Sequence, residues 1–169
     1  MSNILFDSKA VNAALDAMAA AMRAPEVNIV GIQRGGALVA DALQARLEKT
    51  GAKVRRGDLD ISFYRDDLDT IGPNPSVRPS NLPFDVSDAG IWLVDDVLYT
   101  GRTIRAALGE IFDYGRPASV KLAVLVDRGG RELPVAADCI GFKVSAPVGS
   151  SVKLVTDGDW HIMQRQVKG

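Results

Sequence analysis

Two neighbouring carboxylates and a Thr-Gly-Arg-Thr segment lie close together near the middle of this 169-residue chain. Asp95 and Asp96 directly follow an apolar run at residues 91–94, and the Thr-Gly-Arg-Thr segment at residues 100–103 comes shortly afterwards. Carboxylates accept hydrogen bonds from sugar hydroxyls and help to hold divalent metals. Threonine hydroxyls and the free N–H groups at the start of a helix favour phosphate. These residues therefore predict a site for a sugar phosphate.

A buried strand and a helix are expected to position these groups. The run at residues 91–94 has no polar break, as is typical of a central strand in a parallel sheet. Apolar residues recur at helical spacing from Ile104 to Ile111, and Gly115 predicts the end of that helix. In parallel α/β sheets, ligands bind where strands end and helices begin. A solvated aspartate pair in an ordinary turn is the alternative, but the glycine and hydroxyls in the same connection favour a site.

A second glycine-rich loop follows the predicted strand at residues 27–32 and precedes a predicted helix from residue 37 to about 49. Glycines let the backbone present its N–H groups, and an arginine adds a cation, so the loop suits a diphosphate. Its residues are Gln33, Arg34, Gly35 and Gly36.

Further elements are predicted along the rest of the chain. Val11 to Met22 show helical spacing after the capping candidate Asp7, and the methionines there are typical of core packing. Alternation predicts a half-buried strand at residues 58–63, a near-continuous apolar run predicts one at 120–126, and a short strand is expected at 138–142. The tail carries two candidate strands, at residues 152–155 and 160–167.

The segment of residues 65–87 carries four prolines and no periodic pattern. A stretch of this length inside a compact domain is typically a functional lid or disordered, and we favour a lid. Arg65 and Arg78 are the cations that it could bring to a site, although an ordinary solvated role for Arg78 is equally consistent with its loop position.

Composition narrows the class of protein. A chain of this length that is 47% apolar suits one domain, and its net charge of −1 provides no overall attraction to nucleic acid or membranes. The single cysteine, Cys139, excludes an internal disulfide framework, and no apolar stretch is long enough to span a membrane. We therefore expect a soluble cytoplasmic protein. The only histidine, His161, has no partner spacing that suggests a metal or a triad.

The central motif resembles the 5-phosphoribosyl-1-diphosphate (PRPP) loop of type I phosphoribosyltransferases. The string Val-Asp-Asp-Val-Leu-Tyr-Thr-Gly-Arg-Thr at residues 94–103, followed by Val-Asp-Arg-Gly-Gly-Arg-Glu-Leu-Pro at 126–134, is similar to one branch, the bifunctional pyrimidine-operon regulator/uracil phosphoribosyltransferases. The similarity extends from about Asp7 to Phe142.

This resemblance implies the α/β type I phosphoribosyltransferase fold, with a central parallel sheet flanked by helices in a single domain of residues 1–169. It also implies a small hood over the base, contributed by about residues 127–169, and a flexible lid loop at about 65–87. The implied reaction joins uracil to the ribose phosphate of PRPP, giving UMP and diphosphate, with Mg²⁺ as cofactor, in a homodimer or homotetramer.

The resemblance also implies the roles of individual residues. Asp95 and Asp96 are the catalytic pair that holds the ribose hydroxyls, and they help to hold Mg²⁺, which is bound mainly through PRPP. The residues implied to bind diphosphate are Gln33, Arg34, Gly35, Gly36 and Arg65. The residues implied to bind the 5-phosphate are Val97, Leu98, Tyr99, Thr100, Gly101, Arg102 and Thr103.

Base binding is implied for Asp127, Arg128 and Ile140. Purine enzymes of this type commonly carry a lysine where this chain has Asp127. The absence of that lysine favours a pyrimidine as the base. Uracil presents an N3–H donor between two carbonyls, which backbone groups around Ile140 and the side chain of Arg128 could match. The Arg-Gly-Gly sequence at residues 34–36 looks more like the loop of purine enzymes, which keeps a guanine or hypoxanthine enzyme as an alternative.

A regulatory protein that binds RNA in response to UMP is another alternative within the family. Members with that activity place basic and polar residues on the first helix and beside the hood strand. Here Asp16, Ala20, Ala136 and Phe142 stand at those positions, and Arg131 is the cation that is kept. Because Lys and Arg contacts to phosphate supply most RNA affinity, we expect RNA binding and transcription attenuation to be weak or lost.

Overall fold

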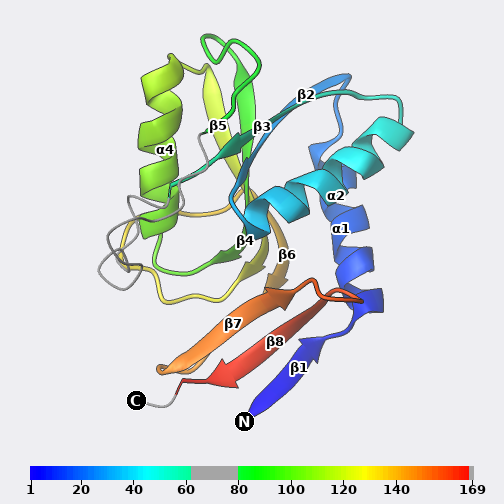
Figure 1. Cartoon of the computed structure of the whole chain (residues 1–169), viewed down its shortest axis with the longest axis vertical. Coiled ribbons are helices and arrows are strands. Elements are labelled where there is room, and N and C mark those ends of the chain that lie inside the picture. Colours follow the sequence, from blue (N-terminus) through cyan, green and yellow to red (C-terminus); the bar gives the residue numbers. More distant parts are fainter. Residues whose placement is uncertain (62–79, 168–169) are drawn as a thin grey trace.

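The computed structural model of the protein describes residues 1–61 and 80–167 and contains two sheets (Figure 1). The larger sheet has five parallel strands in the order β3-β2-β4-β5-β6. These strands are β2 (Glu26–Ile32), β3 (Lys53–Leu59), β4 (Gly90–Leu98), β5 (Ser119–Asp127) and β6 (Cys139–Lys143). Parallel pairing of β2 with β4, with Asn28 opposite Ile91, confirms the predicted α/β sheet.

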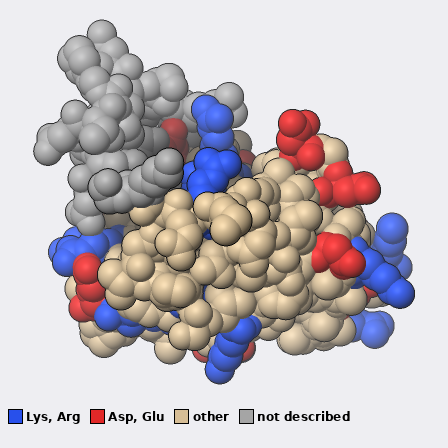
Figure 2. Space-filling model, turned by 90° about the horizontal axis from the view of Figure 1, so that it is seen from below, with Lys and Arg blue, Asp and Glu red and all other residues tan. Residues whose placement is uncertain are grey.

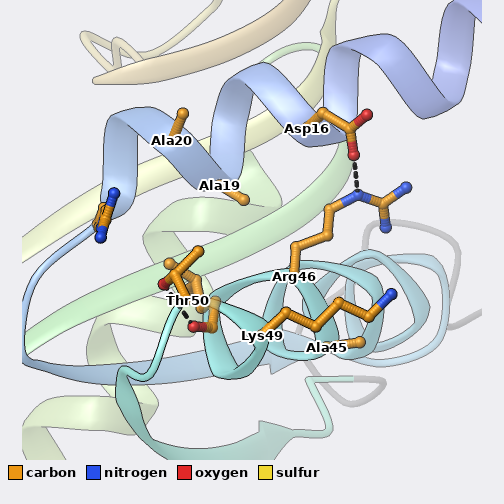
Figure 3. A pocket seen from close by; sticks show the side chains of 9 residues that line it. Asp16, Ala19, Ala20, Ala45, Arg46, Lys49 and Thr50 are labelled. Carbon is orange, nitrogen blue, oxygen red and sulfur yellow. Dashed lines mark hydrogen bonds and ion pairs between the residues drawn. The ribbon is translucent and has the colours of Figure 1, made fainter.

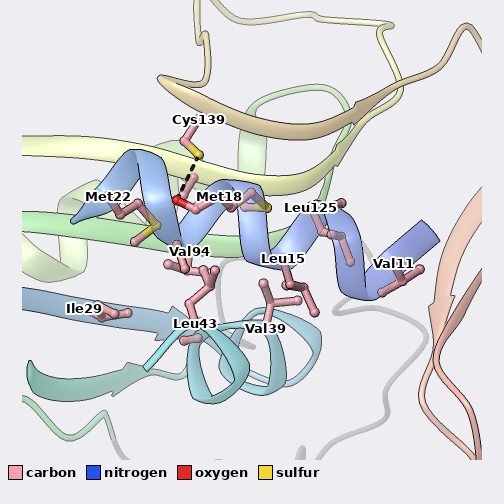
Figure 4. Close-up of a cluster of buried hydrophobic side chains, with 14 of the residues drawn as sticks. Val11, Leu15, Met18, Met22, Ile29, Val39, Leu43, Val94, Leu125 and Cys139 are labelled. Atoms are coloured by element: carbon pink, nitrogen blue, oxygen red, sulfur yellow. Dashed lines mark hydrogen bonds between the residues drawn. The ribbon is translucent and has the colours of Figure 1, made fainter. Parts of the chain in front are cut away.

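Helices cover both faces of this sheet. The helices are α1 (Ser8–Met22), α2 (Gly35–Lys49) and α4 (Arg102–Tyr114). Alternate strand residues point to opposite faces, so Val94 on β4 packs in a cluster with α1 and α2, whereas its neighbour Leu93 packs in a cluster with α4. Figure 4 shows Met18 of α1 and Leu43 of α2 in the first cluster.

The helix ends follow from local sequence. Asp7 caps α1, its Oδ1 accepting a hydrogen bond of 2.9 Å from the N–H of Ala10. Helix α2 begins at Gly35, two residues earlier than its apolar pattern predicted, and Gly51 follows it with a φ of 89°. Helix α4 follows Gly101, whose φ of 94° favours glycine.

The smaller sheet, called the hood here, joins the two ends of the described chain (Figure 1). Its strands are β1 (Ser2–Phe6), β7 (Ser150–Val155) and β8 (His161–Gln166), in the antiparallel order β1-β8-β7. The tail strand pair was predicted, but β1 was not. Phe6 of β1 stacks on Phe142 of β6 with ring centroids 3.9 Å apart, so the hood is packed against the parallel sheet.

Two boundary predictions were wrong. The strand expected at residues 58–63 is instead β3, which ends at Leu59. Part of the expected lid belongs to the body of the protein, since Val86 is 2% exposed and Asn81 exchanges two backbone hydrogen bonds of 2.8 Å with Asp58. Arg65 and Arg78, the cations assigned to the lid, lie outside the described residues.

Within residues 1–61 and 80–167, none of the helices combines the length and the apolar character needed to span a membrane. Cys139 is a free cysteine buried at the start of β6. Burial, followed by the nearby charge of Asp138, raises the pKa of its thiol, so the thiol is expected to behave as an apolar core group.

Candidate active site

The acidic pair lies inside β4, near its carboxyl end. The strand continues beyond the apolar run to Leu98, and Asp95 pairs with Val124 of β5. Oδ1 of Asp95 accepts a hydrogen bond of 2.9 Å from the N–H of Asp96, and Oδ1 of Asp96 accepts one of 2.8 Å from the N–H of Val97. Only 7% of Asp95 is exposed, whereas Asp96 is half-buried.

The N-terminus of α2 lies directly against these carboxylates. A methyl group on Gly35 would overlap the carboxylate of Asp96, with its carbon 2.5 Å from Cγ. A methyl group on Gly36 would lie 2.5 Å from the carbonyl oxygen of Val94. The first N–H groups of a helix have no partners within it and carry positive partial charge. The glycines thus bring the N-terminus of α2 beside two carboxylates.

Arg56 fixes the start of α2 from the neighbouring strand β3. Its Nη2 donates a hydrogen bond of 2.9 Å to the carbonyl of Ala37 and forms ion pairs with Asp41 at 3.2 Å and Asp58 at 2.8 Å. The side chain is 13% exposed, and its Nη1 also contacts the carbonyl of Gly57. This charged network holds the first turn of α2 in place, and sequence reasoning missed it because β3 was expected later in the chain.

Residues 99–103, named here the phosphate loop, connect β4 to α4. The N–H of Arg102 donates a hydrogen bond of 3.2 Å to the hydroxyl of Thr100. The Thr100 carbonyl accepts hydrogen bonds from the N–H groups of Glu132 at 2.9 Å and Leu133 at 3.0 Å. The start of the loop is therefore tied to the segment that follows β5, while the N-terminus of α4 is at its other end, as the sequence predicted.

Arg131 connects the phosphate loop to the end of β5. Its Nη1 donates a hydrogen bond of 2.6 Å to the carbonyl of Tyr99, and its Nε donates one of 2.8 Å to the carbonyl of Val135. Its Nη2 contacts both carboxylate oxygens of Asp127, at 2.8 and 2.7 Å. The side chains of Arg131 and Asp127 are 24% and 14% exposed. We call this arrangement the Arg131 bracket.

The bracket favours the ionised form of Asp127. Burial tends to raise the pKa of the carboxyl group, but hydrogen bonds from Arg131 and from the N–H of Gly129, with the charges of Arg131 and Lys143, outweigh it. The pKa of Asp127 is therefore held below its usual value. An ionised carboxylate accepts hydrogen bonds only, and this one is already occupied by Arg131.

Arg128 connects the phosphate loop to the hood. It is 6% exposed, and its Nη1 donates a hydrogen bond of 2.8 Å to the carbonyl of Ser150, the first residue of β7. Its guanidinium lies over the ring of Tyr99, 3.8 Å from the centroid. Burial lowers the pKa of Arg128, and the nearby Tyr99 partly opposes that shift. Its Nε is buried without a hydrogen-bond partner among the described residues.

Ile140 lies within β6, opposite Val124 of β5. It is half-buried and packs against the apolar cluster on the α4 side of the sheet. Asp127 and Lys143 face each other at the carboxyl ends of the same two strands. Lys143 is thus a cation at this end of the sheet that the predicted base-binding set did not include.

The surface predicted to have lost RNA contacts contains more cations than α1 alone suggests. A hollow of about 420 Å³ between α1 and α2 is lined in part by Asp16, Arg23, Arg46 and Lys49. Arg46 reaches from α2 to Asp16 with an Nε–Oδ1 distance of 2.7 Å (Figure 3). Three cations and one carboxylate give this hollow a formal charge of +2. Arg131, the expected main anchor for RNA, is instead occupied by the bracket.

The described residues on the hood side of the molecule form no continuous basic surface. Figure 2 shows that uncharged side chains fill most of this face outside the grey atoms, with basic and acidic side chains interspersed around its rim. Phe142 stacks on Phe6, whereas Ala136 is exposed. This arrangement contrasts with the clustered Lys and Arg that binding to nucleic acid requires.

The structure brings the two predicted loops and the acidic pair together at one edge of the parallel sheet. Asp127 and Arg128 lie beside the phosphate loop, and Arg65 lies outside the described residues. Sequence reasoning missed the bracket and the Arg128–Tyr99 contact. An Asp and an Arg four residues apart suggest a surface pair on a helix, and here they lie in a connection after a strand.

Residues 2–154 match the model of the phosphoribosyl transferase domain family. The chain is 55% identical over 126 residues to the bifunctional protein PyrR of Nitrosococcus oceani, covering 75% of this chain and 71% of that protein. It is 46% identical over 142 residues to the protein of the same name from Akkermansia muciniphila, covering 82% of this chain and 80% of that protein.

Solved structures with similar folds include phosphoribosyltransferases that act on purines. The hypoxanthine phosphoribosyltransferase of Trypanosoma cruzi matches with a TM-score of 0.73 and 20% identity, covering 98% of this chain and 97% of that one. A hypoxanthine-guanine phosphoribosyltransferase of Bacillus anthracis matches with a TM-score of 0.68 and 16% identity, covering 85% and 84%. At this identity the likeness establishes the fold alone.

Proposed function

The chain belongs to the PyrR family of phosphoribosyl transferase domains, and we propose that it joins uracil to the ribose phosphate of PRPP, releasing UMP and diphosphate. One observation carries the proposal: the N-terminus of α2, with Gly35 and Gly36, lies against Asp95 and Asp96 at the same sheet edge as the phosphate loop. The proposed diphosphate, ribose and 5-phosphate sites would thus be adjacent, in the order that PRPP requires.

The proposed roles follow from the charge that develops during transfer. Departure of diphosphate leaves positive charge on the ribose, so Asp95 and Asp96 would stabilise the sugar while binding its hydroxyls. The start of α2, with Gln33 and Arg34, would stabilise the leaving diphosphate. The phosphate loop would hold the 5-phosphate and so orient the sugar. Arg65 is proposed as a further diphosphate ligand. The reaction needs no covalent nucleophile.

Magnesium fits this site only together with PRPP. Among the described residues no group of three or more His, Cys, Asp or Glu side chains could hold a metal on its own. Asp95 and Asp96 supply the hard oxygen ligands that Mg²⁺ prefers, and the oxygens of PRPP would complete its coordination. The bound ion would neutralise charge on the diphosphate.

Base recognition is proposed for the segment of Asp127 and Arg128 together with Ile140. The side chains of Asp127 and Arg128 already have partners within the protein. We therefore favour recognition of uracil through backbone groups around Ile140 and the hood segment, which can offer an acceptor between donors. The structural likeness to purine enzymes does not bear on the base, because it establishes the fold alone.

RNA binding is proposed to be weak. The name of the curated relatives indicates a second activity in those proteins, but Arg131 is tied to three groups of this chain and Arg46 is paired with Asp16. We propose a cytoplasmic homo-oligomer whose main activity is catalytic. The free, buried Cys139 supports a reducing compartment.

Product analysis tests the proposed reaction. The protein would be incubated with PRPP, Mg²⁺ and, in separate reactions, uracil, guanine, hypoxanthine and xanthine. We expect UMP to form, with a kcat/KM for uracil above that for each of the three purine bases. A higher kcat/KM for the formation of GMP or IMP would show that the preferred base is a purine and not uracil. Absence of every nucleotide product would refute the enzymatic function.

A further inference from the structure

Arg131 is held by three separate parts of the chain. Its guanidinium donates to the Tyr99 carbonyl in the phosphate loop, to the Val135 carbonyl, and to both oxygens of Asp127. The adjacent residues Glu132 and Leu133 donate their N–H groups to the Thr100 carbonyl. Two successive carbonyls of the phosphate loop are therefore bound from the same short segment.

The packing around the loop depends on that segment as well. A methyl group on Gly101 would lie 3.1 Å from a methyl carbon of Val135, whose carbonyl accepts from Arg131. Gly101 has a φ of 94° and immediately precedes α4. The segment that leads into α4 is therefore held by residues 132–135, and Arg131 joins that segment to Val135 through the carbonyls of Tyr99 and Val135.

We infer that Arg131 is a positioning residue for the 5-phosphate site, and that the side chain of Asp127 serves this site by orienting Arg131 and not by reading the base. This inference rests on the proposed function. It deepens that function by naming the pair of side chains that keeps the phosphate loop in its binding shape.

The alternative roles of these two residues predict different behaviour. A cation that contacted the phosphate directly would be replaced well by lysine, because charge would be its main contribution. A guanidinium that joins two carbonyls and a carboxylate needs the planar fork of arginine, which lysine lacks. A carboxylate that read the base would affect uracil binding whether or not Arg131 was present.

The experiment compares wild type with Arg131→Lys, Arg131→Gln, Asp127→Asn and the Arg131→Gln/Asp127→Asn double variant. Arg165→Gln, an exposed arginine on β8, is the matched control. The Kd of UMP and of uridine would be measured by calorimetry, and hydrogen exchange would be followed at residues 99–103. The ratio of the two affinities isolates the contribution of the phosphate. KM for PRPP and for uracil would also be determined.

Both Arg131 variants should lower the UMP/uridine affinity ratio about ten- to a hundred-fold, the usual effect of a small misplacement of binding groups, and should speed exchange at residues 99–103. KM for PRPP should rise while KM for uracil stays within about threefold. Asp127→Asn should act in the same direction, and the double variant should be no worse than Arg131→Gln, since residues in one network are not additive. Arg165→Gln should match wild type.

Three results would overturn the inference. The first is a wild-type UMP/uridine affinity ratio in Arg131→Lys, and the second is an unchanged ratio and unchanged hydrogen exchange in Arg131→Gln. The third is a rise in KM for uracil in Asp127→Asn that adds to the effect of Arg131→Gln in the double variant. Failure of the proposed function would look different. In that case wild type would form no UMP, yet faster exchange in the Arg131 variants would still establish the role of the bracket in shaping the loop.

Discussion

Gly35 and Asp96 occupy adjoining space, so that a methyl group on the glycine would overlap the carboxylate of the aspartate. They belong to different elements, Gly35 to the first turn of α2 and Asp96 to the end of β4. Glycine at this position serves close approach, since it lets the two predicted ligand-binding segments meet. This contact and the neighbouring one at Gly36 provide a matched pair of substitutions.

Gly35→Ala should reduce kcat/KM for UMP formation by about a hundred-fold, or about 3 kcal/mol, because the added methyl group displaces the carboxylate of Asp96 from the ribose. The unfolding temperature should stay close to that of wild type, since the obstructing atoms are the end of a side chain and alanine favours a helix. Enzyme assays and thermal unfolding measure the two effects. Full activity would show that Asp96 need not occupy its present position.

Gly36→Ala should lower the free energy of unfolding by about 1–3 kcal/mol. Its methyl group would lie 2.5 Å from the backbone carbonyl of Val94, so α2 must move away from β4. Urea denaturation measures this effect. A variant as stable as wild type would mean that α2 can shift without cost. The two glycine substitutions would then not distinguish an effect on activity from an effect on stability.

Asp96→Asn should abolish most transfer while preserving the fold. Asparagine keeps the oxygen that accepts from the N–H of Val97 at 2.8 Å, so the local structure can persist without the charge. Addition of Asp95→Asn should remove the remaining transfer but should also lower stability, because Asp95 is 7% exposed. Near-normal turnover by the double variant would contradict the proposed role of the pair.

The ion pair of Asp127 with Arg131 should make stability depend on pH below about 4. The folded-state pKa of Asp127 is depressed, so its contribution is fully present above the unfolded value of about 3.9 and is lost as pH falls through the lower folded value. Asp127→Asn should therefore be less stable than wild type at pH 7 by about 2 kcal/mol, and the difference should shrink with acidification. Urea denaturation across this pH range provides the test. A constant difference would argue against the ion pair as its source.

RNA carrying a pyrimidine-gene leader hairpin should form no sequence-specific complex at physiological salt, with or without UMP. Arg131 is held by the bracket and Arg46 is paired with Asp16, so these two arginines of the described chain are engaged within the protein and are not free to contact phosphates. Gel-shift titration provides the measurement. Submicromolar binding enhanced by UMP would contradict the prediction, and loss of that binding in Arg23→Gln/Lys49→Gln would locate it in the hollow between α1 and α2.

The sequence predicted the parallel sheet and the tail strands because each has a strong local pattern. Strand β5 contains an unbroken apolar run at residues 122–126, and α1 has both its cap and its helical spacing. The prediction failed for β1, whose pairing with β8 depends on contacts at the far end of the chain. It also failed at β3, where Arg55 and Arg56 interrupt an apolar pattern.

The two predicted anion loops are adjacent in the structure, because parallel strands end at one edge. The partners of Asp127 and Arg128 could not be predicted, since they depend on how the segment after β5 folds back. Glycines mark places of close approach, but only the fold shows that the neighbour of Gly35 is Asp96. The sequence thus predicted which segments meet at one edge of the sheet, but not which side chains support them.

The pairing of β1 with β8 imposes an order on folding during synthesis. Among the described elements β1 is made before the others, and its only sheet neighbour there is β8, which is made after them. The parallel sheet can assemble while translation continues, whereas the smaller sheet must wait for β8. During that interval β1 is an unpaired strand with the exposed residue Ile4. A ribosome that stalls before residue 161 would therefore present a nascent chain in which β1 has no partner strand. We expect chaperones to bind this unpaired strand.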